Sequence, residues 1–519
     1  MKGGDCIYCS INSASIWGIE PYIVKVETDI AQGMPCFNMV GLLSSEVREA
    51  KERVRTALKN SGENLPMYRI TVNLSPADRR KEGSGFDLPI ALGLLCAMGR
   101  INIQMFEKCM VVGELGLDGE IKKVNGILPI VSMAKEIGFK RCIVPEENIQ
   151  ESSIIHGIEI MAFNNLSEVI KCFGEGNSGI NTNQVIIKAE DAYYNEEEIQ
   201  CGDYKDIIGQ ESVKRSLLIS ACGWHNIMLI GSPGVGKSML ASRLPGIMPD
   251  MTDKEKMEVS NIHSICGLLS NNRLISARPF VEPYHTITAS ALVGGGNIPR
   301  PGQITIAHKG VLFLDELPEF GQNVLDLLRQ PLEEKKIRIN RMSGNYVFPA
   351  DCLVVTAMNP CKCGYFPDRS RCNCSERDVK AYMGRISGPI IDRMDMSIEV
   401  PRVEMTENYT DEYTDEHSDN NFLSTEKMKS IVKKTAAIQM DRQYGVFNGR
   451  LNNKQVNKYC RLKKYESDFM REAYNSFKMS MRGYYKVIKV ARTIADIEKS
   501  EDIKVEHLSE ALGYRVDFK

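Results

Sequence analysis

The sequence lacks any apolar run that approaches the roughly 18–20 residues needed to cross a lipid bilayer. Residues 1–18, MKGGDCIYCSINSASIWG, also lack the sustained apolar core of a secretory signal peptide. Net charge is nearly absent as well, since 65 Lys and Arg face 67 Asp and Glu and leave −2 at pH 7. The whole chain therefore has no global electrostatic attraction to nucleic acid, and a DNA-binding surface would have to be local or completed by several copies. We expect a cytoplasmic protein that contacts no membrane.

A disulfide framework is also not expected, although the chain has 16 cysteines, because the cytosol keeps thiols reduced. Five of them stand inside apolar runs, where a thiol serves as a small core residue: Cys96, Cys109, Cys142, Cys222 and Cys352. What is present is an ordinary globular composition, with 43% hydrophobic and 25% charged residues. At 519 residues, and with roughly 100–200 residues per domain, the chain should form about three domains.

The first 172 residues alternate short apolar runs with helical patterns. Residues 68–74, 109–115 and 141–145 have the apolar character of strands. Residues 44–62 carry apolar side chains at helical spacing and end in Ser-Gly, which is typical of a helix C-terminus. We therefore expect an α/β or α+β domain over residues 1–172.

Two polar stretches divide the rest of the chain. Residues 173–203 are rich in Gly, Asn and acidic residues and are predicted to be a linker. Residues 404–424 are strongly acidic and almost without aliphatic side chains, which favours a flexible connection. Between them, residues 204–403 have the pattern of an α/β domain, and residues 425–519 show no strand-like alternation and are predicted to form a small helical domain.

A phosphate-binding loop is predicted within residues 226–244, NIMLIGSPGVGKSMLASRL. The motif G-x-x-x-x-G-K-S follows an apolar strand and precedes a helical run, which is the required context. Glycines let backbone N–H groups turn toward phosphate oxygens, Lys237 supplies a cation at the β and γ phosphates, and the Ser238 hydroxyl can ligate Mg²⁺. The predicted nucleotide-binding residues are Gly231, Ser232, Pro233, Gly234, Val235, Gly236, Lys237, Ser238 and Met239.

The second half of the predicted site is KGVLFLDELPEF, residues 309–320. Four apolar residues make a buried strand, and Asp315 and Glu316 follow it. Such a pair alone commonly marks only a strand end, but after a phosphate-binding loop it predicts that Asp315 holds Mg²⁺ and Glu316 activates the attacking water. A third strand ends at Asn359, which could bond the water or the γ-phosphate, or could instead cap the turn that follows.

Four cysteines follow Asn359 within fourteen residues, in the stretch MNPCKCGYFPDRSRCNCSERD. Four thiolates can close a tetrahedral Zn²⁺ site, and nearby Lys and Arg favour the thiolate form. The Cys-x-Cys spacing is less usual in such sites than Cys-x-x-Cys, so reduced free thiols and redox pairing remain as alternatives. The possible zinc ligands are Cys361, Cys363, Cys372 and Cys374.

The motifs above and one further motif are contained in four stretches that follow one another along the chain: YKDIIGQESVKRSLLISACGWHNIMLIGSPGVGKS, RPGQITIAHKGVLFLDELPEF, TAMNPCKCGYF and SGPIIDRMDMSIEVP. In this combination the chain resembles the magnesium-chelatase-like AAA+ ATPases, and within them the YifB/ComM group of bacteria, over nearly its whole length. The resemblance implies that Arg393 is an arginine finger and that Arg482 is the sensor-2 arginine of a helical lid. Arg385 and Arg492 are the alternatives, and ordinary ion-paired arginines remain a third reading. A finger that reaches a neighbouring subunit requires an oligomer, and the family forms hexameric rings.

Two further segments of the resemblance bear on DNA. Residues 275–303, rich in Gly and Pro, resemble the inserted pore-facing hairpin of this group. Residues 335–351 alternate like a β-hairpin and carry Lys335, Lys336, Arg338 and Arg341. One such hairpin would be a solvated face, but six copies in a ring would line a basic channel for DNA.

The N-terminal part resembles the Lon-protease-like fold, also called ribosomal-protein-S5-like, in residues 77–95 and 113–139. The family's serine turn has Gly85 at the place of the nucleophile, and Leu128 stands where the lysine belongs. A Ser-Lys dyad needs an unprotonated amine, which leucine does not supply. Ser84 could be a displaced nucleophile, but a DNA-binding or ring-organising role is the favoured interpretation.

The resemblance implies an ATP- and Mg²⁺-dependent hexameric motor on single-stranded or branched DNA. ComM-type proteins promote branch migration during the uptake of foreign DNA, and the resemblance extends that expectation to this chain. The alternatives are a metal-chelatase motor subunit and a protein-remodelling AAA+ ATPase. The expected fold class is α/β, with an α+β N-terminal domain, a parallel-sheet P-loop core and a helical C-terminal lid.

Overall fold

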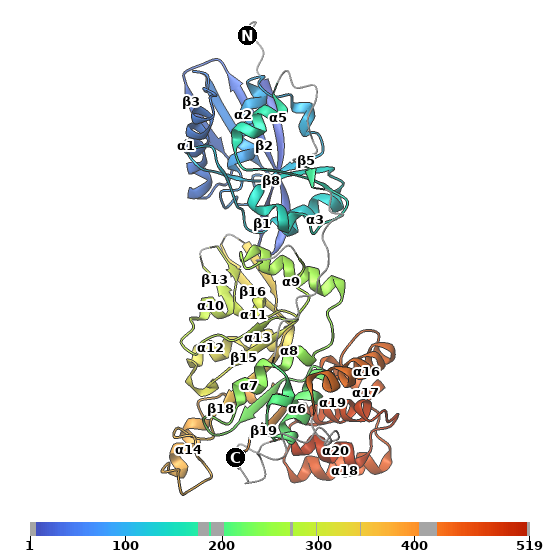
Figure 1. The fold of residues 1–519 in the computed structure, drawn as a ribbon. Coiled ribbons are helices and arrows are strands. Elements are labelled where there is room, and N and C mark those ends of the chain that lie inside the picture. Colours follow the sequence, from blue (N-terminus) through green and yellow to red (C-terminus); the bar gives the residue numbers. More distant parts are fainter. Residues whose placement is uncertain are drawn as a thin grey trace. The chain divides into compact units, whose positions relative to one another are not determined.

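The computed structural model describes residues 7–174, 186–187, 202–269, 273–296, 298–342, 344–403 and 423–515. The predicted linker at 173–203 and the acidic connection at 404–424 lie mostly outside these residues. The described chain has a mixed α/β fold and divides into two compact units (Figure 1). The first comprises Met1–Glu196 with Lys256–Ile275 and Asn340–Tyr346, and the second comprises Glu197–Glu255, Ser276–Ile339 and Val347–Lys519.

The first unit is built on an eight-stranded sheet of order β10-β9-β8-β5-β1-β2-β4-β3. Strands β1, β2 and β4 pair antiparallel, whereas β3 on β4 and the series β1-β5-β8-β9 are parallel. The strands are β1 (Ile7–Trp17), β2 (Glu20–Ala31), β3 (Cys36–Val40), β4 (Arg69–Ser75), β5 (Cys109–Val111), β8 (Arg141–Pro145), β9 (Glu159–Phe163) and β10 (Ile186–Ile187).

Helices complete the first unit, and the longer ones bury apolar side chains in its core. In α2 (Asp87–Ala97) every residue is buried, and it packs on β1 and β2 at the centre of the core. The other helices are α1 (Ser45–Asn60), α3 (Ile127–Ile137), α4 (Ile149–Ser152) and α5 (Leu166–Phe173). Helix α1 begins at the predicted place, where the Ser44 side chain accepts a hydrogen bond from the Val47 N–H.

The strand predicted at 109–115 is wrong as a single element. It divides into β5 and β6 (Glu114–Leu115), and β6 pairs with β7 (Ile121–Lys122) in a separate two-stranded sheet. The break falls at Gly113, where an added Cβ would lie 3.0 Å from Leu88 and 3.1 Å from Ile121. The carbonyl of Gly113 accepts a hydrogen bond from the Leu88 N–H, so the backbone turns against α2 here.

The second unit contains the predicted parallel sheet, of order β12-β15-β18-β11-β19. All its neighbouring strands run parallel, so their carboxyl ends meet at one edge. The strands are β11 (Ile227–Ile230), β12 (Phe280–Val281), β15 (Val311–Leu314), β18 (Leu353–Met358) and β19 (Met396–Glu399). Residues 275–303 do not form one hairpin: they provide β12, the helix α10 (Ala289–Val293) and a two-residue strand pair, β13 (Gly294–Gly295) with β14 (Arg300–Pro301).

The remaining helices lie in the middle of the chain and in its C-terminal part (Figure 1). The former are α6 (Glu211–Gly223), α7 (Lys237–Ser242), α8 (Leu244–Ile247), α9 (Asp253–Ile265), α11 (Gln303–Ile306), α12 (Gln322–Leu327), α13 (Arg329–Glu334), α14 (Glu376–Met383) and α15 (Gly388–Ile391). The latter are α16 (Thr425–Gln443), α17 (Asn453–Tyr459), α18 (Lys464–Ser476), α19 (Met481–Ile497) and α20 (Val505–Gly513). Within the described residues no helix is long and apolar enough to cross a membrane.

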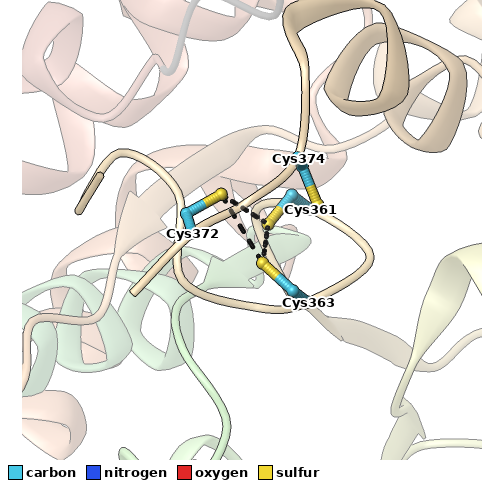
Figure 2. A group of neighbouring side chains, drawn as sticks. All are labelled: Cys361, Cys363, Cys372 and Cys374. Atoms are coloured by element: carbon cyan, nitrogen blue, oxygen red, sulfur yellow. Dashed lines mark hydrogen bonds between the residues drawn. The ribbon is translucent and has the colours of Figure 1, made fainter. Parts of the chain in front are cut away.

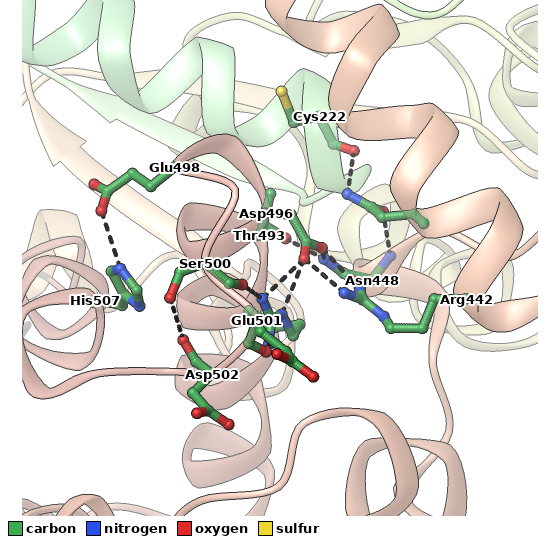
Figure 3. Close-up of polar contacts among 12 residues, drawn as sticks. Cys222, Arg442, Asn448, Thr493, Asp496, Glu498, Ser500, Glu501, Asp502 and His507 are labelled. Atoms are coloured by element: carbon green, nitrogen blue, oxygen red, sulfur yellow. Dashed lines mark hydrogen bonds and ion pairs between the residues drawn. The ribbon is translucent and has the colours of Figure 1, made fainter.

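The C-terminal helices share one core with α6 and the parallel sheet. A buried polar network pins them together around Asp496, which accepts hydrogen bonds from Arg442, Arg492 and Asn448 (Figure 3). Gln439 extends the network to α6 by donating to the Cys222 carbonyl at 3.1 Å. The Gln439–Cys222 hydrogen bond therefore connects the network of the C-terminal helices to α6.

The hairpin predicted at 335–351 is present as β16 (Lys336–Arg341) paired with β17 (Gly344–Pro349). Lys336 and Arg338 are exposed on one face of β16, and Arg338 pairs with Glu334. The inclusion of Lys335 among the exposed basic residues is wrong. Its ammonium donates to the Leu332 carbonyl, and burial lowers the pKa of Lys335 to about 8.

Candidate nucleotide-binding site

The predicted phosphate-binding loop connects β11 to α7. Gly234 and Gly236 have φ of +80° and +89°, a region that side-chain-bearing residues rarely adopt. Gly231 is required for a different reason, because an added Cβ would lie 2.7 Å from the Val400 carbonyl oxygen. The backbone path of the loop itself therefore requires glycine at these positions of the motif.

A cleft of about 350 Å³ lies along this loop. Its walls come from the loop and from the carboxyl ends of β15 and β18, which the parallel sheet brings to one edge. The lining residues are Pro233, Gly234, Val235, Gly236, Lys237, Ser238, Met239, Asp315, Glu316, Met358 and Asn359. All predicted nucleotide-binding residues except Gly231 and Ser232 line it.

Lys237 reaches across the loop to the third predicted strand. Its Nζ donates to the carbonyls of Gly231 and Ser232 at 2.6 and 3.0 Å and to Asn359 Oδ1 at 3.1 Å. Burial lowers the pKa of Lys237, while Asp315 and Glu316 oppose that shift. The Asn359 side chain thus contacts Lys237, the cation that is predicted to bind phosphate, rather than capping the turn that follows.

Ser238 and Asp315 form the oxygen pair expected of a Mg²⁺ site. The Ser238 hydroxyl donates to Asp315 Oδ2 at 2.7 Å, although 77 residues separate them. Hydroxyl and carboxylate oxygens are the hard ligands that Mg²⁺ takes beside nucleotide phosphates. The donor set therefore fits Mg²⁺ together with ATP.

Glu316 projects from a backbone in the left-handed region, with φ of +51°. Its N–H donates to Asp315 Oδ1 at 2.8 Å, and its side chain remains about half exposed. His285 Nδ1 lies 3.4 Å from Glu316 Oε2. The neighbouring Glu282 lies near Asp315, and burial with the Asp315 charge raises the pKa of Glu282. Sequence reasoning missed both residues, because nothing local distinguishes them in the segment after β12.

The two predicted arginines lie together but do not line the cleft. Arg393 follows α15 and Arg482 is on α19, and each has Nη2 2.7 Å from the same oxygen, Oε1 of Glu333. Asn226, just before β11, donates its side-chain amide to the Arg393 carbonyl at 3.3 Å. The phosphate-binding loop follows the other end of β11, about 16 Å away at ~3.3 Å per residue. The arginines thus stand at the opposite edge of the sheet from the cleft.

Of the two alternatives, Arg492 differs from Arg393 and Arg482 in its surroundings, whereas Arg385, like Arg482, is half exposed and has an acidic partner. Arg492 is buried, pairs with Asp496 and donates to the carbonyls of Ser500 and Glu501, so its contacts are structural. Arg385 is half exposed and pairs with Glu319 at 3.1 Å.

The four clustered cysteines converge from two turns of one segment (Figure 2). Their sulfur atoms all lie within 4.8 Å of one another. Cys361 and Cys372 are buried, and the backbone N–H of Tyr365 lowers the pKa of Cys363. All 14 cysteines among the described residues are free thiols, including the five predicted in apolar runs, which are buried.

In the first unit, Ser84 lies beside the place of the family's nucleophile and Leu128 at the place of its lysine. The Ser84 hydroxyl bonds to Glu114, and Leu128 is fully buried at the place of the family's lysine. Asp87, three residues after Ser84, accepts two hydrogen bonds from Arg53, at 2.7 and 3.0 Å. Ser84 thus faces a carboxylate rather than an amine.

The cleft and its parallel sheet define a P-loop domain of the AAA+ class. Family models described as "Magnesium chelatase, subunit ChlI", "Subunit ChlI of Mg-chelatase" and "Magnesium chelatase, subunit ChlI C-terminal" match residues 203–408, 26–148 and 423–515. The chain is 39% identical to competence protein ComM of Haemophilus influenzae over 97% of both chains, and 36% identical to protein YifB of Escherichia coli over 97% and 96%. Lon protease 2 of Bacillus subtilis is 29% identical over about a third of each chain.

The chain therefore belongs to the magnesium-chelatase-like AAA+ family, in the group that contains ComM and YifB. A Lon-like N-terminal part, a parallel-sheet core and a helical C-terminal part make up its fold.

Proposed function

We propose that the protein is a homohexameric ring ATPase that moves along DNA and drives branch migration of recombination intermediates. The observation that carries the ATPase part is the meeting of Lys237, Ser238, Asp315, Glu316 and Asn359 around one cleft. The DNA part is supported by identity to a relative named a competence protein over nearly the whole chain. The free thiols agree with a cytoplasmic location.

In this proposal each group of the cleft has one task. Lys237 binds the β and γ phosphates, and Ser238 with Asp315 holds Mg²⁺, which neutralises charge that develops on the phosphates. Glu316 accepts the proton of the attacking water, since its exposed carboxylate is open to solvent in the cleft. Asn359 orients that water or the γ-phosphate from its place beside Lys237.

Arg393 and Arg482 complete the cleft of a neighbouring subunit. They lie at the edge of the sheet away from their own cleft, so a ring is the arrangement that brings them to a γ-phosphate. In the single chain Glu333 accepts a contact from both guanidinium groups on one oxygen. We assign to Glu333 the role of an internal counter-ion that the γ-phosphate of the neighbour replaces.

His285 restrains Glu316, the proposed general base, as Glu333 restrains the two arginines. Its ring nitrogen lies 3.4 Å from the Glu316 carboxylate, and the two side chains are both partly exposed. Displacement of His285 would release Glu316 toward the water. Each half of the composite site thus carries its own restraining contact.

The DNA-facing surface in this proposal includes β16, where Lys336 and Arg338 are exposed. Six copies would add the charge that a near-neutral chain lacks. The N-terminal part would organise the ring or bind DNA rather than cleave peptides, since Ser84 has a carboxylate as its partner.

A second candidate function is a chelatase-type motor subunit, which the family models favour by their names. A protein-remodelling ATPase is a third. ATP turnover is the measurement that separates them, in the presence of single-stranded, duplex, forked and four-way DNA. We expect branched DNA to stimulate turnover, with stimulation falling steeply as salt rises. If none of these DNAs binds or changes the rate, the DNA-motor proposal is wrong.

A further inference from the structure

The segment after Asn359 forms a small body whose centre is made of sulfur. We propose that Cys361, Cys363, Cys372 and Cys374 bind a structural Zn²⁺ and that the resulting knuckle supports the phosphate-binding loop. The metal assignment is independent of the ATPase proposal, whereas the effect of the knuckle on ATP affinity rests on it.

The sulfur geometry fits a single tetrahedral ion. The Cys361–Cys363, Cys363–Cys372 and Cys361–Cys372 sulfur atoms are 3.3, 3.5 and 3.7 Å apart, and Cys374 lies within 4.8 Å of all three (Figure 2). Four sulfurs at ~2.3 Å from one Zn²⁺ would stand about 3.8 Å from each other. A disulfide would instead require about 2.05 Å. The cluster is therefore too open for disulfides and close to the size of a mononuclear site.

The knuckle has little else to hold it together. Its apolar cluster consists of Cys361, Cys372 and Val379, with Tyr365, Phe366 and Met383 partly buried around them. A body of this size cannot bury enough apolar surface to order itself, and natural small folds use a metal or disulfides for that purpose.

Two arginines of the knuckle pack on aromatic rings of the same segment as the thiols. The Arg371 guanidinium lies 4.2 Å from the centre of the Tyr365 ring, and Arg369 lies 5.0 Å from that of Phe366. Arg369 also donates to the Cys374 carbonyl at 2.7 Å. Four thiolates with one Zn²⁺ carry a net charge of about −2, which these two cations offset.

The knuckle touches the nucleotide cleft at two places. Gly364 has φ of +88°, and an added Cβ would lie 2.4 and 2.7 Å from ring carbons of Pro233 in the phosphate-binding loop. Cys361 follows Asn359 by two residues, and the Asn359 side chain accepts the hydrogen bond from Lys237. A metal that fixes Cys361 and Cys363 therefore fixes the turn that rests on Pro233.

The metal assignment is tested by elemental analysis of full-length protein purified without added zinc. We expect about one Zn²⁺ per protomer in the wild type and in the control Cys36→Ser, whose thiol is exposed and outside the knuckle. The double variant Cys363→Ser/Cys374→Ser should lose the metal. Wild-type protein without zinc, wild-type protein with iron instead, or a double variant that retains a full complement of zinc would overturn the assignment.

The support of the loop is tested separately with Gly364→Ala. We expect zinc content to stay at the wild-type value while ATP affinity falls by roughly tenfold to a hundredfold, because the loop is displaced at Pro233. Gly513→Ala, whose Cβ would meet nothing within 4 Å, is the matched control and should bind ATP normally. Wild-type affinity in Gly364→Ala would refute the support. Wild-type protein that binds no ATP would refute the ATPase proposal and leave the zinc measurement intact.

Discussion

The cleft-side half and the arginine-side half of the composite ATPase site differ in how they are assembled. In the cleft, Lys237 contacts Asn359 and Ser238 contacts Asp315, at the carboxyl ends of parallel strands. On the arginine side, Arg393 and Arg482 meet only through Glu333, which is contributed by α13. The cleft residues thus meet within one chain, whereas Arg393 and Arg482 do not line that cleft.

In the proposed ring, the arginine side acts on another copy of the chain. Strand β11 connects the halves, with Asn226 holding the Arg393 carbonyl before it and the phosphate-binding loop after it. A shift of this strand would therefore move both halves. Such a shift would couple the nucleotide bound by one subunit to the nucleotide bound by its neighbour.

The largest effect is expected from variants that inactivate the cleft in some subunits and the arginine side in others. Arg393→Ala alone should lower ATP turnover by roughly 10³–10⁵-fold, the usual value of an arginine finger, and Lys237→Ala alone should be inactive. Mixed rings of the two variants should recover turnover, since some interfaces join an intact cleft to an intact Arg393. If rings that contain both variants, detected by co-purification through different affinity tags, show no recovery of turnover, Arg393 does not act on a neighbouring subunit.

Within the cleft, Glu316→Gln should lower turnover by roughly 10²–10⁴-fold while ATP still binds, because only the proton acceptor is removed. Glu319→Gln is the matched control, since Glu319 pairs with Arg385 and does not line the cleft. Rates are measured by phosphate release and binding by a fluorescent ATP analogue. Native turnover in Glu316→Gln would show that another group is the base.

A smaller effect is expected from Glu333→Gln on the arginine side. Loss of the carboxylate charge should free both arginines and raise turnover roughly two- to fivefold at limiting protein concentration, as a partly exposed ion pair allows. Glu334→Gln changes the adjacent residue, which pairs with Arg338, and should leave the rate unchanged. A lower rate in Glu333→Gln at all protein concentrations would show that Glu333 positions the arginines for catalysis instead.

The smallest effect is on stability and concerns His225, which precedes Asn226. Burial lowers the pKa of His225 to about 4, with Asp395 opposing and Lys489, Arg450 and Lys486 adding to the shift. Because the folded pKa lies below the unfolded value of 6.5, the stability is present above pH 6.5 and is lost as pH falls toward 4.

Lowering the pH from 7 to 5 should therefore reduce the free energy of unfolding by about 2 kcal/mol through His225. Chemical denaturation gives the free energy of unfolding of wild type and His225→Gln at both pH values. Subtracting the pH dependence of the variant from that of the wild type cancels the contribution of other titrating groups. An equal pH dependence in the two proteins would contradict the assignment.

The sequence predicted the cleft well because its residues stand in short motifs at strand ends. Glu333 and His285 could not be predicted, since the contact of Glu333 with Arg482 spans 149 residues and neither residue stands in a motif. In the first unit, β1 and β2 were not predicted, although β2 alternates buried residues such as Val24 and Val26 with more exposed ones. Lys335 was misplaced because alternation alone does not show that its backbone, at φ of +57°, turns the amine inward.

A labelled four-way junction tests whether the protein moves DNA by hydrolysing ATP. Wild-type protein with ATP and Mg²⁺ should convert the junction into duplex products, and Glu316→Gln should bind the junction with similar affinity without converting it. Wild-type protein that hydrolyses ATP and binds the junction but leaves it intact would contradict the DNA-motor proposal.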